Sequence, residues 1–161
     1  MSSLASPTYL VVANRTLDGA ALHERLRRIV DAVPAARFHV IVPLRAPVLV
    51  SCDPVMAGYS VAEWDAVTSA RADAEARLDD LLAWLAARGA PASGSVLGAD
   101  PVLAVERALA QHPADAIVVS TLPNRLSRWL RLDLPRRLSR FGIPVVTVVN
   151  EEASAPPAVV G

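Results

Sequence analysis

The chain has 161 residues, 53% of them hydrophobic, and its 16 basic and 16 acidic residues give a formal net charge of zero. This length suits one domain with a substantial hydrophobic core, and a neutral total is not typical of a general nucleic-acid-binding protein. Every basic residue other than His is Arg, which excludes mechanisms that need a Lys, including Schiff-base formation. The single cysteine, Cys52, cannot form an intrachain disulfide or a cysteine metal cluster.

The sequence predicts a short strand and then an amphipathic helix near its start. Residues 1–7 are polar and are expected to form a flexible end. Residues 9–13 are a continuous apolar run, typical of a fully buried strand, and Asn14 follows them directly. Beyond Gly19, apolar residues recur at helical spacing until Pro34.

A second buried strand is predicted over 37–43, where His39 is interpreted as a packed or hydrogen-bonded residue rather than a metal ligand. Residues 44–59 then form a long connection. A loop of this length in a compact domain is often functional or a partner surface. Its segment 48–50 also has the composition of a short extra strand, and the sequence leaves these alternatives open.

Ser60 and Glu63 have the spacing of a capping box, which predicts a helix from Ser60 to about Arg88 with Gly89 as its stop. Its two tryptophans are interpreted as packing groups. The expected buried stripe of this helix consists of Val67, Ala70, Ala74, Leu78, Leu81 and Leu85.

Two further strand and helix pairs complete the pattern. Residues 92–98 are a weakly marked strand, and Asp100 followed by Pro101 predicts the capped start of a helix over 101–111. Residues 116–120 are a fourth buried strand.

The region that follows carries several arginines. Pro135 forbids one regular helix throughout it, so a short turn capped by Ser127 and a second helix from about Leu134 to Phe141, capped by Asp133, are expected. Gly142 ends that helix, residues 143–149 are the last strand, and residues 151–161 are a Pro/Ala-rich tail, expected to be flexible.

Five strands that alternate with helices predict a doubly wound, three-layer α/β/α domain with a parallel sheet over residues 8–150. In such a sheet, ligands bind at the carboxyl ends of the strands. The N-terminal residues lack the pattern of a signal peptide, and no apolar stretch reaches the length of a membrane span, so we expect a cytoplasmic protein without a membrane partner.

The element order, the loop after the fourth strand, residues 126–130 and the segment 142–145 together resemble the universal stress protein family. The resemblance covers residues 8–150. It implies a Rossmann-like five-stranded sheet in the order 3-2-1-4-5 and, in many members, a homodimer formed by the last strands, here Val145–Val149. Nucleotide-binding members hold ATP with an Asp after the first strand and a glycine-rich stretch after the fourth.

The chain departs from that nucleotide pattern. Asn14 stands at the Asp position, the segment 120–125 replaces the glycine loop, and residues 131–133 stand near the later Gly-Ser position. Glycines let the backbone approach phosphates, whereas Leu122 adds bulk and Pro123 removes a donor. The sequence therefore does not predict the standard triphosphate cradle.

Arginines at intervals of three after the fourth strand suggest a different anion site. The first hypothesis is a non-enzymatic module that weakly binds ATP, AMP or another phosphorylated anion through Asn14, Thr16, Ser120, Thr121, Asn124, Arg125 and Arg128. The alternative for these arginines is a solvated or ion-paired face. The second hypothesis is a dimeric interaction scaffold without a nucleotide, which uses the 44–59 connection or the Trp129 region. A hydrolase is disfavoured because the sequence shows neither a base nor metal ligands around the loop.

Overall fold

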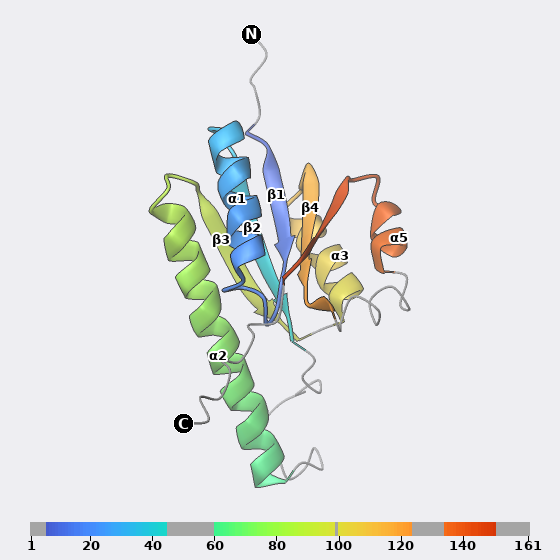
Figure 1. The fold of residues 1–161 in the computed structure, drawn as a ribbon. Helices are drawn as coiled ribbons and strands as arrows, with labels where there is room; N and C mark the ends of the chain where they lie inside the picture. Colours follow the sequence, from blue (N-terminus) through green and yellow to red (C-terminus); the bar gives the residue numbers. More distant parts are fainter. Residues whose placement is uncertain (1–5, 45–59, 99, 124–133, 151–161) are drawn as a thin grey trace, which may run out of the picture.

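Five parallel strands form one sheet in the order β3-β2-β1-β4-β5 (Figure 1). The computed structural model describes residues 6–44, 60–98, 100–123 and 134–150. The strands are β1 (Thr8–Val12), β2 (Arg37–Pro43), β3 (Ala92–Leu97), β4 (Ala116–Thr121) and β5 (Val145–Val149). The predicted strand order and the doubly wound fold class are confirmed.

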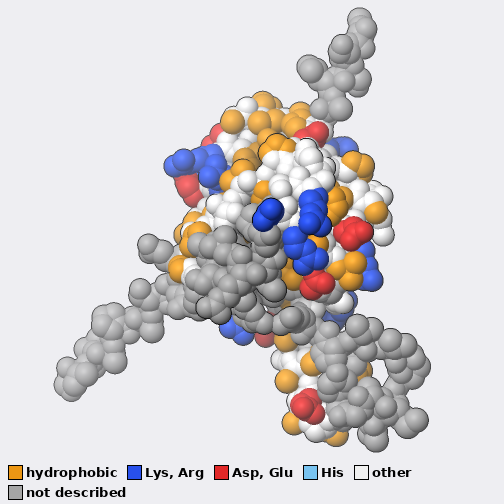
Figure 2. Space-filling view, turned by 90° about the vertical axis from the view of Figure 1, so that its right-hand side faces the viewer, with side chains coloured by type: hydrophobic (Ala, Val, Ile, Leu, Met, Phe, Trp, Pro, Cys, Tyr) orange, Lys and Arg blue, Asp and Glu red, His pale blue; other side chains and the backbone are white. Residues whose placement is uncertain are grey.

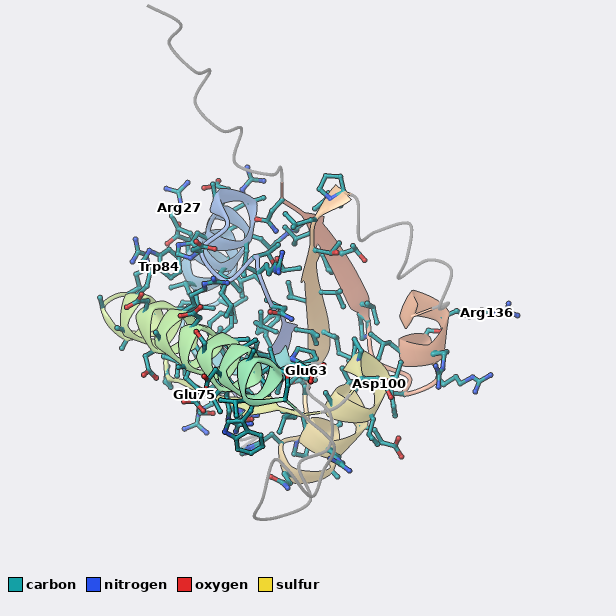
Figure 3. All side chains as sticks on the ribbon, turned by 90° about the horizontal axis from the view of Figure 1, so that it is seen from below. Arg27, Glu63, Glu75, Trp84, Asp100 and Arg136 are labelled. Carbon is teal, nitrogen blue, oxygen red and sulfur yellow. The ribbon has the colours of Figure 1, made fainter. Side chains whose placement is uncertain are left out.

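Helices cover both faces of the sheet. They are α1 (Ala20–Ala32), α2 (Val61–Ala86), α3 (Pro101–Gln111) and α5 (Leu134–Ser139). Seen from below, α1 and α2 lie on one side of the sheet and α3 and α5 on the other (Figure 3). Side chains of a strand alternate between faces, so Val11 joins the core under α1 and α2, whereas Leu10 and Val12 join the core under α3 and α5.

The helix boundaries follow the capping residues. Ser60 Oγ accepts a hydrogen bond from the Glu63 amide at 3.2 Å, and Glu63 Oε2 accepts one from the Ser60 amide at 2.8 Å. The Ser60 amide and hydroxyl both donate to Glu63 Oε2, and these two bonds lower the pKa of the Glu63 carboxyl. Asp100 Oδ1 likewise accepts from the Val102 amide at 2.9 Å. The predicted capping box and the predicted cap of α3 are therefore confirmed.

The buried stripe expected along α2 is wrong at its N-terminal end. Ala74, Leu78, Leu81 and Leu85 are buried, but Val67 is only half-buried and Ala70 is exposed. A helix of 26 residues is about 39 Å long, whereas a strand of 6 residues such as β3 spans about 20 Å. The first turns of α2 consequently run past the end of the sheet (Figure 1).

The last helix is shorter than predicted: α5 ends at Ser139, whereas the sequence predicted an end at about Phe141. A turn that contains Gly142, with φ 68°, follows the helix and leads towards β5. Leu138 is fully buried, and the exposed residues beside it include Arg136, Arg137 and Arg140. Figure 2 faces this side of the molecule and shows several Arg side chains on it.

Several sequence-based predictions lie outside the described residues. They concern the 44–59 connection beyond Leu44, the strand at 48–50, the caps at Ser127 and Asp133, and Trp129. Within the described ranges, no helix combines the length and the hydropathy that a membrane crossing requires.

Candidate functional site

The candidate site lies at the carboxyl edge of the sheet, between β1 and β4. In the order β3-β2-β1-β4-β5, successive connections leave β1 and β4 in opposite directions. The chain segments that follow these two strands thus flank the switch point, where open α/β sheets usually bind ligands. Residues 13–19 lie on one side of this point, and the end of β4 lies on the other.

Three buried polar side chains form a continuous chain of hydrogen bonds at this point. Ser120 Oγ donates to Thr16 Oγ1 at 2.8 Å, and Asn150 Nδ2 donates to Ser120 Oγ at 2.8 Å. The exposed fractions of Thr16, Ser120 and Asn150 are only 3%, 1% and 2%. Polar groups this deeply buried need internal partners, and these three satisfy one another. We refer to Thr16, Ser120 and Asn150 as the Asn150 network.

Asn150 also caps the first helix from a distant part of the chain. Its Oδ1 accepts a hydrogen bond from the Leu22 amide at 3.0 Å, across 128 residues of sequence. The N-cap residue of α1 is Gly19, which contributes no side-chain hydrogen bond. The backbone N–H of Asn150 donates to the Thr121 carbonyl at 2.8 Å, which extends the pairing of β5 with β4. Asn150 therefore joins α1, β4 and β5.

Gly19 provides the space that this arrangement requires. Its φ of −68° suits any residue, so backbone freedom does not explain the glycine. A Cβ at this position would lie 2.6 Å from Asn150 Cγ and 3.0 Å from the Thr16 carbonyl oxygen. A larger residue would displace the side chain that caps the helix.

The structure brings together some of the predicted site residues and separates another. Thr16 and Ser120 meet, whereas Thr121, the next residue of β4, points to the opposite face of the sheet, is buried, and donates from Oγ1 to the Leu122 carbonyl at 3.4 Å. Asn14 instead donates from Nδ2 to the Pro43 carbonyl at 3.0 Å, at the end of β2. Asn124, Arg125 and Arg128 lie outside the described residues.

Sequence reasoning missed Asn150, although a signal was present. Asn150 directly follows the last apolar strand, just as Asn14 directly follows the first. In a parallel sheet, both positions fall at the carboxyl edge. Every buried side-chain nitrogen and oxygen atom of the described residues has a hydrogen-bond partner. Among the same residues, no group of three or more His, Cys, Asp or Glu is placed to hold a metal ion.

Comparison with solved structures places this architecture among known folds. A crystal structure of a protein from the universal stress protein family of Burkholderia pseudomallei matches with a TM-score of 0.58 and 21% identity, over 88% of this chain and 95% of that one. The chain has the universal stress protein fold. This result confirms the resemblance seen in the sequence at the level of the fold.

Two further structures of universal stress proteins, both from Archaeoglobus fulgidus, are also similar. One matches with a TM-score of 0.46 and 16% identity, over 88% of this chain and 93% of that one. The other, a complex with dAMP, matches with a TM-score of 0.46 and 17% identity, over 88% and 96%. No family model and no curated protein matches the sequence.

Proposed function

We propose that this chain is a non-enzymatic, universal stress protein-like module that acts in the stress response as a dimeric interaction scaffold. The observation that carries the proposal is the cap that Asn150 places on α1. A helix N-terminus at the switch point is where a phosphate group would bind. Here the Leu22 amide of that terminus is already bonded to Asn150 Oδ1 at 3.0 Å. The protein's own side chain takes the role that a ligand oxygen would have.

The geometry of β5 supports the dimer. β5 is the last strand of the sheet and pairs with β4 alone among the described strands. Its residues are largely accessible, and Val149 is 39% exposed. An apolar edge strand with unpaired backbone groups is a template for pairing with another chain. A second copy of β5 would satisfy these groups.

A proline substitution tests this pairing without breaking the sheet. The Pro144 carbonyl and the Asn150 amide both bond to β4, and in a parallel ladder the residues that bond to one neighbour alternate. The Thr147 amide therefore faces the open edge. We expect Thr147→Pro to sediment as a monomer at concentrations where the wild type and the Thr147→Ala control are dimers, because only Pro removes the amide donor. A wild type that sediments as a monomer would contradict the dimer.

A second candidate function is weak binding of a phosphorylated anion, such as ATP or AMP, at the carboxyl edge. The meeting of Thr16 and Ser120 favours it, since two of the predicted site hydroxyls do converge there, 2.8 Å apart. In this hypothesis the positive charge that binds the anion comes from Arg125 and Arg128. A ligand here would have to exchange its hydrogen bonds for those of the Asn150 network.

Thermal unfolding with ATP, ADP, AMP or inorganic phosphate separates the two candidates. A ligand at a hundred times its Kd adds about 2.7 kcal/mol to the free energy of unfolding. The scaffold proposal predicts that, at millimolar concentration, none of these ligands causes a shift that depends on Arg125 and Arg128. A shift that disappears in Arg125→Glu with Arg128→Glu would establish the second candidate and overturn the first.

A further inference from the structure

A second polar cluster lies on the face of the sheet that carries α3, near the amino ends of the strands. It lines a groove of about 600 Å³ between β3 and the C-terminal half of α3. Because His39 is the third residue of β2 and His112 directly follows α3, the two histidines lie towards the opposite end of the strands from the Asn150 network, and the groove extends from them along β3 to Leu97. Its polar lining residues are His39, Ser93, Ser95, Arg107, Gln111 and His112.

The two histidines of the groove are stacked on each other. Their ring centroids are 4.1 Å apart, with an angle of 26° between the ring planes. His39 is buried and its Nδ1 lies 2.9 Å from Ser93 Oγ on the neighbouring strand, whereas His112 is exposed at the end of α3. Burial, and then the nearby His112, lower the pKa of His39. An anion in the groove would oppose this effect by stabilising the charged imidazole of His39.

The charge around the groove has one sign. Arg107 from α3 lines it, and Arg37, at the start of β2, lines an adjoining hollow of about 350 Å³ that shares both histidines. Neither arginine forms an ion pair with another described residue. No Asp or Glu is among the described residues that line either cavity. Arg107 thus presents a guanidinium that is free to bind phosphate in bidentate fashion.

We propose that this groove binds a small organic phosphate monoester, with its phosphate on Arg107 and His112 and its organic part against Leu97 and Ala108. The number of donors favours a phosphate, because Arg107, Gln111, His112 and the hydroxyls of Ser93 and Ser95 exceed what one carboxylate can accept. The volume of about 600 Å³ exceeds that of an inorganic anion and leaves room for an organic group. The apolar walls give that group a surface to cover.

The histidines themselves report on binding. The chain has 3 histidines, so proton NMR resolves one Cε1–H signal for each, and His39→Asn and His112→Asn assign them. His23 is an internal reference, because it lies on α1 and its ring contacts Trp84 of α2 in a tilted arrangement, with ring centroids 4.6 Å apart. A ligand at the carboxyl edge would leave the His39 and His112 signals in place, so this test is independent of the proposed function.

Phenyl phosphate is the probe, with benzoate and inorganic phosphate as comparisons. We expect phenyl phosphate to shift the His39 and His112 signals in a saturable way, to raise the pKa of His39, and to leave the His23 signal unchanged. Inorganic phosphate should bind more weakly because it leaves Leu97 and Ala108 uncovered. Arg107→Gln should weaken phenyl phosphate binding at least about tenfold, as expected for the loss of charge-assisted hydrogen bonds. The exposed Arg25→Gln on α1 is the matched control and should bind as the wild type does.

Three results would overturn the proposal. The first is that phenyl phosphate at millimolar concentration moves neither the His39 nor the His112 signal. The second is that benzoate binds as tightly as phenyl phosphate. The third is that Arg107→Gln binds phenyl phosphate with the wild-type affinity. Because Arg107 is exposed on α3, its substitution leaves the core intact, and a loss of binding in this variant would report on the site itself.

Discussion

Replacing Asn150 with Ala removes two buried hydrogen bonds at once. The Leu22 amide loses its acceptor, and Ser120 Oγ loses the donor at 2.8 Å. An orphaned buried amide costs about 1–3 kcal/mol, and the loss of a helix N-cap about 1 kcal/mol. Since both terms describe one amide, they overlap, and we expect a loss of about 2–3 kcal/mol in the free energy of unfolding. In a chain of this length each kcal/mol lowers the Tm by about 2–4 °C, which gives about 5–10 °C in all.

Urea denaturation followed by far-UV circular dichroism measures this change, with Asn14→Ala as the matched control. Asn14 is half-buried, and its side chain makes one part-buried hydrogen bond, to the Pro43 carbonyl, among the described residues. We expect the control to lose about 1 kcal/mol or less. If Asn150→Ala loses no more than Asn14→Ala does, then Asn150 does not hold α1, and its proposed role as the cap of that helix is wrong.

Two further outcomes follow from the contacts of Gly19 and His39. Gly19→Ala should lower the free energy of unfolding of the wild type, because the new Cβ displaces the Asn150 side chain. The same substitution should lower it less in the Asn150→Ala background. Equal losses in the two backgrounds of this double-mutant cycle would refute the coupling between Gly19 and Asn150. The pKa of His39 is lowered in the folded state from its ordinary value of 6.5, so below that pH the unfolded chain binds a proton that the folded chain does not. The free energy of unfolding should therefore fall as the pH decreases from 6.5 towards the folded-state pKa of His39. Urea titrations at about pH 7.5 and about pH 5.5 should show that the free energy of unfolding falls less in His39→Gln than in the wild type. An equal fall in the two proteins would show that His39 is not the group responsible.

The strands were predictable because both faces of this sheet are covered. A strand buried on both faces is a continuous apolar run, and residues 9–13 and 116–119 are runs of this kind in the sequence itself. Caps were predictable for a related reason. The bonds of Ser60 with Glu63 and of Asp100 with Val102 are local, so spacing along the chain is enough to find them.

The parts that escaped prediction depend on distance in space. Helical spacing gives the face of α2 that turns inward but not the length of the sheet beneath it, which is why Ala70 is exposed. Asn150 and Leu22 are 128 residues apart, and no local pattern marks their contact. His39 and His112 show no ligand spacing in the sequence, yet the register of β2 and the end of α3 stack their rings 4.1 Å apart.

The position of Asn150 also has a consequence for how the chain folds. The residue that caps the first helix is the one that follows the last strand, so α1 cannot complete its N-terminus during synthesis until residue 150 has emerged. Until then the Leu22 amide has only water as its partner, and the carboxyl end of β4 has no neighbour on the side of β5. Docking of β5 supplies both missing partners in one step.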